Sequence, residues 1–135
     1  MAQQSSSYLL NTNFKYNPEA HEAMLREGKA AAFYSPWKEK IERIQEGDRV
    51  FLYQSGTGIV AVGIGSGILD TQEYRGDPEE EYFTPLDQFH ILKTPLSAPE
   101  MRQAAQSQFM FAQTMIALKQ AQSDRLWNYI QENRL

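Results

Sequence analysis

The chain has 135 residues, of which 41% are apolar, and it carries a formal net charge of −4 and no cysteine. This length lies in the single-domain range, so we expect residues 1–135 to form one domain. The absence of cysteine argues against a disulfide framework, a thiolate metal site and a cysteine nucleophile. No apolar run approaches the length that spans a bilayer, and the N-terminus lacks the pattern of a secretory signal. We therefore expect a cytoplasmic protein that does not span membranes.

The first third of the chain combines strand and helix signals. Residues 7–12 form a short apolar run bounded by turn residues, which is typical of a buried strand. Residues 17–19 predict a helix start, because an asparagine cap is followed by a proline that fits the first helical position. Gly28 predicts the end of this helix, and residues 29–34 are expected to be extended. A second helix is predicted from Ser35-Pro36 to Gly47.

The centre of the chain carries the strongest strand signal. Two apolar runs, residues 49–54 and 59–64, are joined by a connection that contains glycine, and this pattern predicts a hairpin. Glycine occupies every second position from 63 to 67. Such glycines weaken a flat sheet but suit a strand that bends sharply or that another backbone approaches closely. We therefore expect a strongly curved sheet, as in a small barrel.

The second half of the chain is predicted to hold shorter strands and two more helices. Residues 70–81 are rich in acidic side chains and predict an exposed loop. Pro85 interrupts the next apolar stretch, which favours an edge strand or a bulge. Residues 109–118 fit a buried helix and an extended segment equally well. The other expected elements are strands at residues 82–83 and 89–92, a helix that starts at 98 behind a capping box, and a last helix from 123.

Catalytic and metal-binding patterns are missing from the sequence. The two histidines, His21 and His90, are far apart and belong to no metal-ligand spacing. The glycines at 63, 65 and 67 lack the lysine and the helix start of a phosphate-binding loop. No nucleophile elbow is present either. The sequence predicts no metal, no cofactor and no catalytic residue.

An ordered set of five segments carries the clearest family signal. They are Asn11-Thr12-Asn13-Phe14, Ala32-Phe33-Tyr34-Ser35-Pro36-Trp37, Lys40-Ile41-Glu42-Arg43-Ile44, Gly47-Asp48-Arg49-Val50-Phe51-Leu52-Tyr53 and Gly58-Ile59-Val60-Ala61-Val62-Gly63. This set resembles the EVE domains of the PUA-like superfamily, which are relatives of ASCH domains and of the YTH readers of methylated adenine in RNA. The resemblance is strongest over residues 8–69, and beyond Asp70 it extends only to the general order of elements.

The resemblance implies an α+β fold, with a small, strongly curved mixed β-sheet or open barrel of five to six strands and about four helices. It also implies an aromatic pocket that accepts one base flipped out of DNA or RNA. A flipped base loses its stacking and regains it between aromatic faces, and a methyl group adds apolar contact. Carried over residue by residue, the ligand-binding positions are Asn11, Asn13, Phe33, Tyr34, Ser35, Trp37, Tyr53 and Ser55.

Each of these positions also fits a purely structural role. Asn11 and Asn13 fit turn residues that fix the chain after a strand. Phe33 and Trp37 fit the core, where large aromatic side chains are common. Ser55 fits a residue that only shapes its turn. The two tyrosines favour a cleft or the surface, because their hydroxyl groups need a partner.

The expected contacts to backbone phosphates come from a group of basic residues in the first half of the chain. The alternative for all of them is solvated surface. The net charge of −4 predicts few such contacts and a modest affinity for nucleic acid. The candidates are Lys29, Lys38, Lys40, Arg43 and Arg49.

Three functions remain open from the sequence. The first is a module that binds a modified or extruded base of DNA or RNA. The second is a protein-interaction or small-ligand module of the same fold, with a protein partner at the acidic segment 77–81. The third is an amidohydrolase for modified nucleosides, as the resemblance to the ASCH branch implies, with Lys38 or Lys40 and Glu39 or Glu42 as candidates. Because these four share one short exposed helix, which argues against a closed site, we expect no enzyme.

Overall fold

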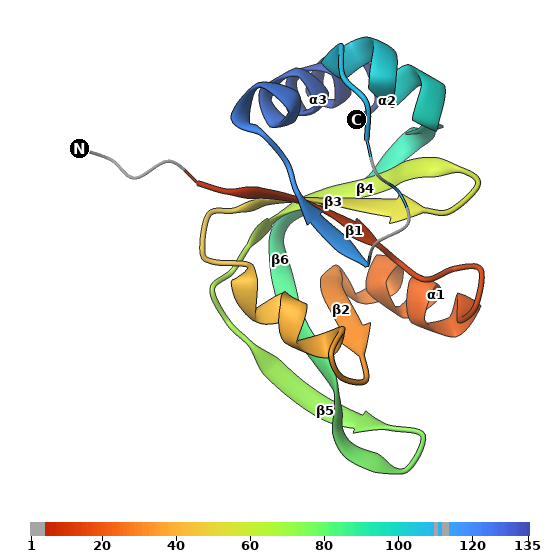
Figure 1. Ribbon diagram of the computed structural model, residues 1–135, viewed down its shortest axis with the longest axis vertical. Coiled ribbons are helices and arrows are strands. Elements are labelled where there is room, and N and C mark those ends of the chain that lie inside the picture. Colours follow the sequence, from red (N-terminus) through yellow and green to blue (C-terminus); the bar gives the residue numbers. More distant parts are fainter. Residues whose placement is uncertain (1–4, 110, 112–113) are drawn as a thin grey trace.

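The computed structural model describes residues 5–109, 111 and 114–135, and its centre is one curled sheet (Figure 1). The strands in these residues are β1 (Ser7–Asn11), β2 (Lys29–Phe33), β3 (Arg49–Gln54), β4 (Gly58–Gly65), β5 (Asp70–Tyr74), β6 (Asp77–Leu96) and β7 (Met115–Ala117). Their order is β2-β6-β4-β3-β1-β7, with β5 paired to β6. β1 runs parallel to β3, and the other pairs are antiparallel. The expected α+β class with a curved mixed sheet is confirmed.

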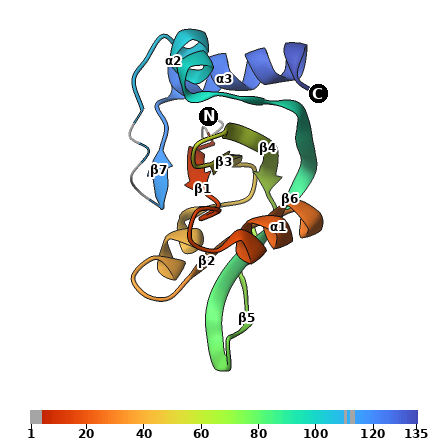
Figure 2. The same ribbon diagram turned by 90° about the vertical axis from the view of Figure 1, so that its right-hand side faces the viewer.

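The curl of the sheet is carried by β6, which is 20 residues long and exchanges partners along its length. Its first half pairs with β2 and β5, and its second half pairs with β4. Pro85 stands where the partners change: it lies opposite Lys29 of β2, and Leu86 lies opposite Gly65 of β4. Figure 2 shows β6 curving from the β5 hairpin towards α2. A proline is tolerated there because the ladder is interrupted at the change of partner.

Two expectations for this region are wrong. The acidic stretch 70–81 is not a loop, because β5 and the start of β6 form a hairpin within it. The runs 82–83 and 89–92 are not separate strands, because both belong to β6. The expected close approach at the glycines of β4 is confirmed. A Cβ atom added at Gly65 would lie 2.4 Å from the carbonyl oxygen of Gln45.

The helices are α1 (Pro18–Glu27), the 3₁₀ helix η1 (Lys38–Arg43), α2 (Ala98–Ala105) and α3 (Gln120–Asn133). Local signals determine where α1 and α2 begin. At α1 the Asn17 side chain accepts a hydrogen bond from the Ala20 N–H, and at α2 Ser97 and Glu100 form the expected capping box. The second expected helix is only the short η1. The last helix begins at Gln120, earlier than expected.

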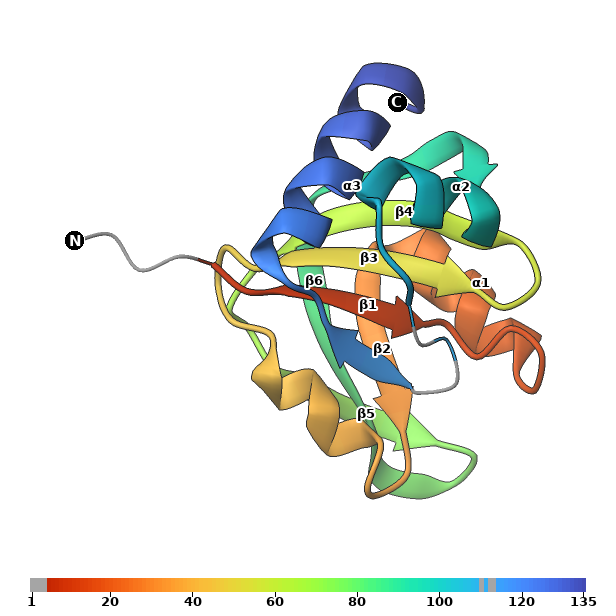
Figure 3. The same ribbon diagram turned by 45° about the horizontal axis from the view of Figure 1, so that its top comes forward.

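The sheet buries apolar side chains on both of its faces, and the alternation along the strands separates two cores. Leu10, Leu52 and Ala61 pack with α1 and η1 in one core. Their neighbours Leu9 and Phe51 pack with α2 and α3 in the other core. Figure 3 shows α2 and α3 together on one side of β3 and β4, away from α1. In the described part of the chain, no helix combines the length and the apolar character needed to cross a bilayer.

Two sequence expectations fall partly outside the described residues. The expectation about a secretory signal rests in part on residues 1–4, which the structure does not describe. Residues 109–118 include 110, 112 and 113, which also lie outside it. Within that stretch Met115–Ala117 forms β7 and pairs antiparallel with β1, so its end is extended rather than helical.

Candidate functional site

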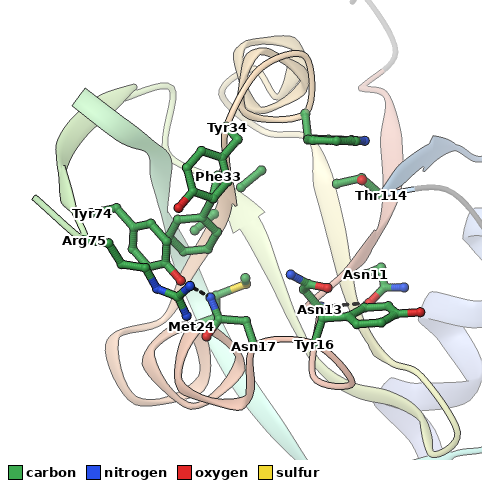
Figure 4. A pocket seen from close by; sticks show the side chains of 13 residues that line it. Asn11, Asn13, Tyr16, Asn17, Met24, Phe33, Tyr34, Tyr74, Arg75 and Thr114 are labelled. Carbon is green, nitrogen blue, oxygen red and sulfur yellow. Dashed lines mark hydrogen bonds between the residues drawn. The ribbon is translucent and has the colours of Figure 1, made fainter. Parts of the chain in front are cut away.

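A cavity of about 470 Å³ lies between the edge strand β2 and the end of β1. Its volume falls within the range of ligand pockets, which is roughly 300–1,000 Å³. Figure 4 shows Phe33, Tyr34 and Tyr74 on one side of the open space, with Asn11, Asn13 and Thr114 on the other. The lining residues are Asn11, Asn13, Tyr16, Asn17, Met24, Ala31, Ala32, Phe33, Tyr34, Trp37, Tyr74, Arg75 and Thr114.

Aromatic side chains form one wall of the cavity. The rings of Phe33 and Tyr74 are 4.4 Å apart between centroids, and Tyr34 meets Tyr74 edge-on at 5.8 Å. Tyr34 is 39% exposed and Trp37 is 48% exposed, although both line the cavity. Large aromatic side chains normally bury most of their surface. The structure therefore excludes a core role for Trp37 and leaves aromatic surface open to a planar ligand.

Amide side chains form the opposite wall. The Asn13 N–H donates to the Asn11 Oδ1 at 2.8 Å, so the expected turn role of these asparagines is confirmed. The same two residues also line the cavity. Among the described residues, the amide nitrogen of Asn11 and the whole side-chain amide of Asn13 have no hydrogen-bond partner. Each free amide group can therefore serve a ligand as well as a turn.

The backbone is left-handed at three residues that line the cavity. The φ angles of Asn13, Tyr34 and Arg75 are 62°, 61° and 51°. Six residues other than glycine have a positive φ in the described chain, so half of them lie at this one site. Such conformations cost on the order of 1–3 kcal/mol each and concentrate at functional sites. This concentration favours a functional role for the cavity.

The floor of the cavity includes backbone groups of the edge strand β2. The Gly28 carbonyl accepts from the Leu86 N–H at 2.8 Å, and the Tyr34 N–H donates to the Glu80 carbonyl at 3.2 Å. In an antiparallel ladder alternate residues face the same neighbour, so Ala31 directs its backbone groups away from β6. Ala31 is buried and lines the cavity, and no strand of the described residues pairs with β2 on that side. Its N–H and carbonyl are thus placed to pair with a ligand.

Three of the expected ligand-binding residues are not brought to the cavity. Ser35 donates a hydrogen bond to Glu39 on η1. Tyr53 is buried in the core beside α2 and α3, where its ring stacks on Phe111 at 4.7 Å. Burial raises the pKa of Tyr53 above its ordinary value. Ser55 belongs to the turn between β3 and β4. The expectation that Tyr53 lies in a cleft or at the surface is therefore wrong.

Three of the five cations that were expected to bind phosphates form ion pairs with carboxylates instead. Lys29 is buried against Glu81, with 2.6 Å between Nζ and Oε2, so a phosphate cannot reach it. The Lys38 ammonium lies 3.5 Å from Glu80. Arg49 pairs with Asp124 of α3 at 2.7 Å, on the sheet face away from α1. Lys40 and Arg43 on η1 have no ion-pair partner among the described residues.

A lysine and a carboxylate are buried together, but not where the enzymatic hypothesis needs them. Glu81, which pairs with Lys29, also accepts a hydrogen bond from Gln72 at 2.7 Å. Neither member of the pair lines the cavity. The residues nominated on η1 form no ion pair with each other in the described chain. We therefore assign no catalytic residue, and within the described ranges no cluster of potential ligands fits a metal ion.

The acidic segment 77–81 is less available to a partner than the sequence indicates. It forms the start of β6 rather than a loop. Glu81 is buried, and Glu80 is paired with Lys38. Asp77 and Glu79 remain exposed. Binding of a protein partner at this segment stays a prediction, and fewer exposed acidic side chains are available for it than the sequence indicates.

A buried histidine beside the cavity predicts that stability falls in acid. His21 Nδ1 lies 2.7 Å from Thr12 Oγ1, and its ring meets Phe14 edge-on at 4.9 Å. Burial lowers the pKa of His21 below 6.5, and the charge of Glu22 only partly opposes this. The unfolded chain then binds a proton more readily than the folded chain as the pH falls below about 6.5. We expect the free energy of unfolding to decrease there and to level off below the folded-state pKa.

Urea unfolding at a series of pH values measures this effect. His21→Gln should flatten the dependence below about pH 6.5, whereas His90→Gln, at an exposed site on β6, should leave it in place. The same pH dependence in wild type and His21→Gln would contradict the prediction.

Known proteins resemble this chain in structure rather than in sequence. No protein-family model and no curated protein matches the sequence. A mutant of the ASCH protein from Zymomonas mobilis superposes with a TM-score of 0.61 at 10% identity, over 90% of this chain and 96% of that one. A protein from Rhodopseudomonas palustris gives 0.60 at 16% identity over 94% and 91%. One from Pseudomonas syringae gives 0.55 at 14% identity over 91% and 98%.

Identities this low show the fold and not the function. The curled sheet of this chain therefore has the fold of the ASCH structures from Zymomonas mobilis. Membership of the PUA-like superfamily stays a prediction from the sequence. The closer resemblance to EVE domains stays a prediction from the sequence.

Proposed function

We propose that this protein is a nucleic-acid-binding module whose cavity accommodates one extruded base of DNA or RNA, including a methylated base. One observation carries the proposal. The cavity is lined both by the exposed aromatic side chains of Tyr34 and Trp37 and by the amide side chains of Asn11 and Asn13. Figure 4 shows Tyr34 across the open space from the two asparagines. An extruded base needs these two kinds of surface, because its faces regain stacking and its edge regains hydrogen bonds.

Stacking and hydrogen bonds to the walls of the cavity can offset the free-energy cost of extruding a base. Leaving the stack costs a few kcal/mol, and stacking on an aromatic side chain returns about 1–3 kcal/mol per base. Asparagine amides and the Ala31 backbone each offer both a donor and an acceptor, as the edge of a base requires. Met24 and Ala31 add apolar surface to the lining, against which a methyl group gains contact. The resemblance to EVE domains points to the same function.

The test is binding of short labelled oligonucleotides, followed by fluorescence anisotropy at several salt concentrations. The strands are single- and double-stranded DNA and RNA, each with and without one methylated base. Wild type is compared with Trp37→Ala and with Tyr34→Asn, which removes an aromatic face while asparagine tolerates the left-handed backbone. Each variant should weaken binding by about 1–3 kcal/mol, or roughly five- to 150-fold, without loss of folding.

A matched control separates the cavity from the rest of the apolar surface. Ile91→Ala truncates another exposed apolar side chain, one that does not line the cavity, and should leave binding unchanged. Full affinity in both aromatic variants would place the binding elsewhere. If wild type bound none of the strands even at low salt, the proposal would be rejected.

A small-ligand module of the same fold is the second candidate. It is favoured by the ion pairs that occupy Lys29, Lys38 and Arg49, because a strand of nucleic acid needs cations along its phosphates. Free nucleosides distinguish the two candidates in a competition assay. A free nucleoside that binds while no oligonucleotide does supports the small-ligand module.

A further inference from the structure

The tip of the β5–β6 hairpin brings an arginine to the cavity. Tyr74 pairs with Asp77 across a two-residue turn, Arg75-Gly76, whose φ angles are 51° and 84°. Two consecutive left-handed residues define a turn that suits the twist of a hairpin and favours asparagine or aspartate before glycine. Arginine is an uncommon choice at the first of these positions. Turn geometry alone therefore does not account for Arg75.

Among the described residues that line the cavity, Arg75 is the one that carries a charge. Its guanidinium carbon lies 5.1 Å from the centre of the Tyr74 ring, and Figure 4 shows its side chain beside Tyr74 and Asn17. In the described chain no carboxylate forms an ion pair with it, although Glu73 and Asp77 lie in the same hairpin. The whole chain has a net charge of −4. The described lining of the cavity thus carries one positive charge on an acidic protein.

We propose that Arg75 binds the phosphate of the nucleotide whose base occupies the cavity. This inference rests on the proposed function and narrows its ligand to a phosphorylated nucleoside unit rather than a free base or nucleoside. A guanidinium presents a planar fork of donors that matches phosphate oxygens, and an aromatic neighbour holds that fork in place. Arg75 enters the cavity from the aromatic side, so base and phosphate are bound by adjacent parts of one wall.

Arg75 differs from three of the basic residues that the sequence predicts as phosphate contacts, because it has no ion-pair partner among the described residues. Lys29, Lys38 and Arg49 are held by carboxylates, so their charges are already compensated. One phosphate contact predicts weak salt dependence, because each contact to a single strand contributes only about 0.7 to the slope of log affinity against log salt. On this acidic protein the affinity is therefore expected to come from one pocket rather than from a basic face.

The test compares nucleosides with their monophosphates by isothermal titration. The probes are adenosine, guanosine, cytidine and uridine, each also as the 5′- and the 3′-monophosphate. For at least one nucleoside we expect the monophosphate to bind wild type about tenfold more tightly than the nucleoside. Arg75→Asn should bring the ratio of monophosphate to nucleoside affinity down to about one, and its fold should be kept because asparagine before glycine suits the same turn. Arg75→Lys keeps the charge but loses the fork, so it should retain part of the preference.

A second readout uses the oligonucleotide assay. Arg75→Asn should reduce the salt slope for single-stranded oligonucleotides by about 0.7, whereas Lys93→Gln, which removes the same charge on the exposed far part of β6, should not change it. The role of Arg75 is overturned if the nucleosides and their monophosphates bind wild type equally well. It is also overturned if the salt slope of Arg75→Asn equals that of wild type. In both cases the proposed function still stands. If no nucleoside, nucleotide or oligonucleotide binds wild type, both fall.

Discussion

Replacing Lys29 with methionine is expected to lower the free energy of unfolding by about 3–5 kcal/mol, because it leaves a buried carboxylate without its counter-charge. The side chains of Lys29 and Glu81 are only 4% and 6% exposed, and their charged atoms are 2.6 Å apart. The Lys29 ammonium also lies 4.6 Å from the centre of the Phe83 ring. Methionine keeps most of the apolar stem but provides none of this compensation.

A variant in which both Lys29 and Glu81 are replaced separates the cost of an unpaired buried charge from the cost of losing the lysine side chain. A double variant, Lys29→Met with Glu81→Leu, removes both charges and should recover most of the lost stability, because an uncharged buried pair has no desolvation cost. Arg26→Met serves as the control, since Arg26 and Glu27 form an exposed ion pair whose loss should cost under about 1 kcal/mol. Urea unfolding curves measure all three variants. An equal loss for Lys29→Met and Arg26→Met would mean that water reaches the Lys29 ammonium.

The elements that the sequence predicts correctly are those with local signals. The start of α1 depends on Asn17 and the proline after it, and the start of α2 depends on Ser97 and Glu100. The hairpin of β3 and β4 follows from two apolar runs around a glycine-bearing turn. In each case the residues that determine the structure are neighbours in the sequence. No knowledge of the rest of the fold is needed.

The β5–β6 hairpin is missed because its residues look like those of a loop. β5 reads Asp-Thr-Gln-Glu-Tyr, and the start of β6 is acidic, so neither has the apolar character of a strand. Their pairing with each other and with β2 overrides this weak propensity. Gly76 is the one signal for a tight turn between them. With the hairpin, the contributions of Tyr74 and Arg75 to the cavity are missed as well.

The candidate site is predicted only in part because it is assembled from distant segments. Asn11, Asn13, Tyr34 and Trp37 come to the cavity from the half of the chain that resembles EVE domains. Thr114 reaches it beside β7, which pairs with β1 more than 100 residues earlier in the chain. Likewise, Lys29 is buried by Glu81, which lies 52 residues away. Charge and periodicity along the sequence do not reveal such long-range partners.

Replacing Gly58 with alanine is expected to cost about 2–6 kcal/mol of the free energy of unfolding, through two effects. The φ angle of Gly58 is +127°, a conformation that costs other residues on the order of 1–3 kcal/mol. An added Cβ would also lie 2.1 Å from the carbonyl oxygen of Leu96, which forces a backbone shift worth about 1–3 kcal/mol more. Gly58 thus allows the start of β4 to lie against the end of β6.

Gly56, in the turn just before β4, is the matched control for this prediction. Its φ is also positive, at +82°, but nothing lies within 4 Å of an added Cβ. Gly56→Ala should therefore cost only the backbone term, about 1 kcal/mol. The difference between their urea unfolding curves measures the contact of β4 with Leu96 together with the extra backbone cost of the φ angle of Gly58. Equal losses would mean that the Leu96 carbonyl moves aside at little cost in free energy.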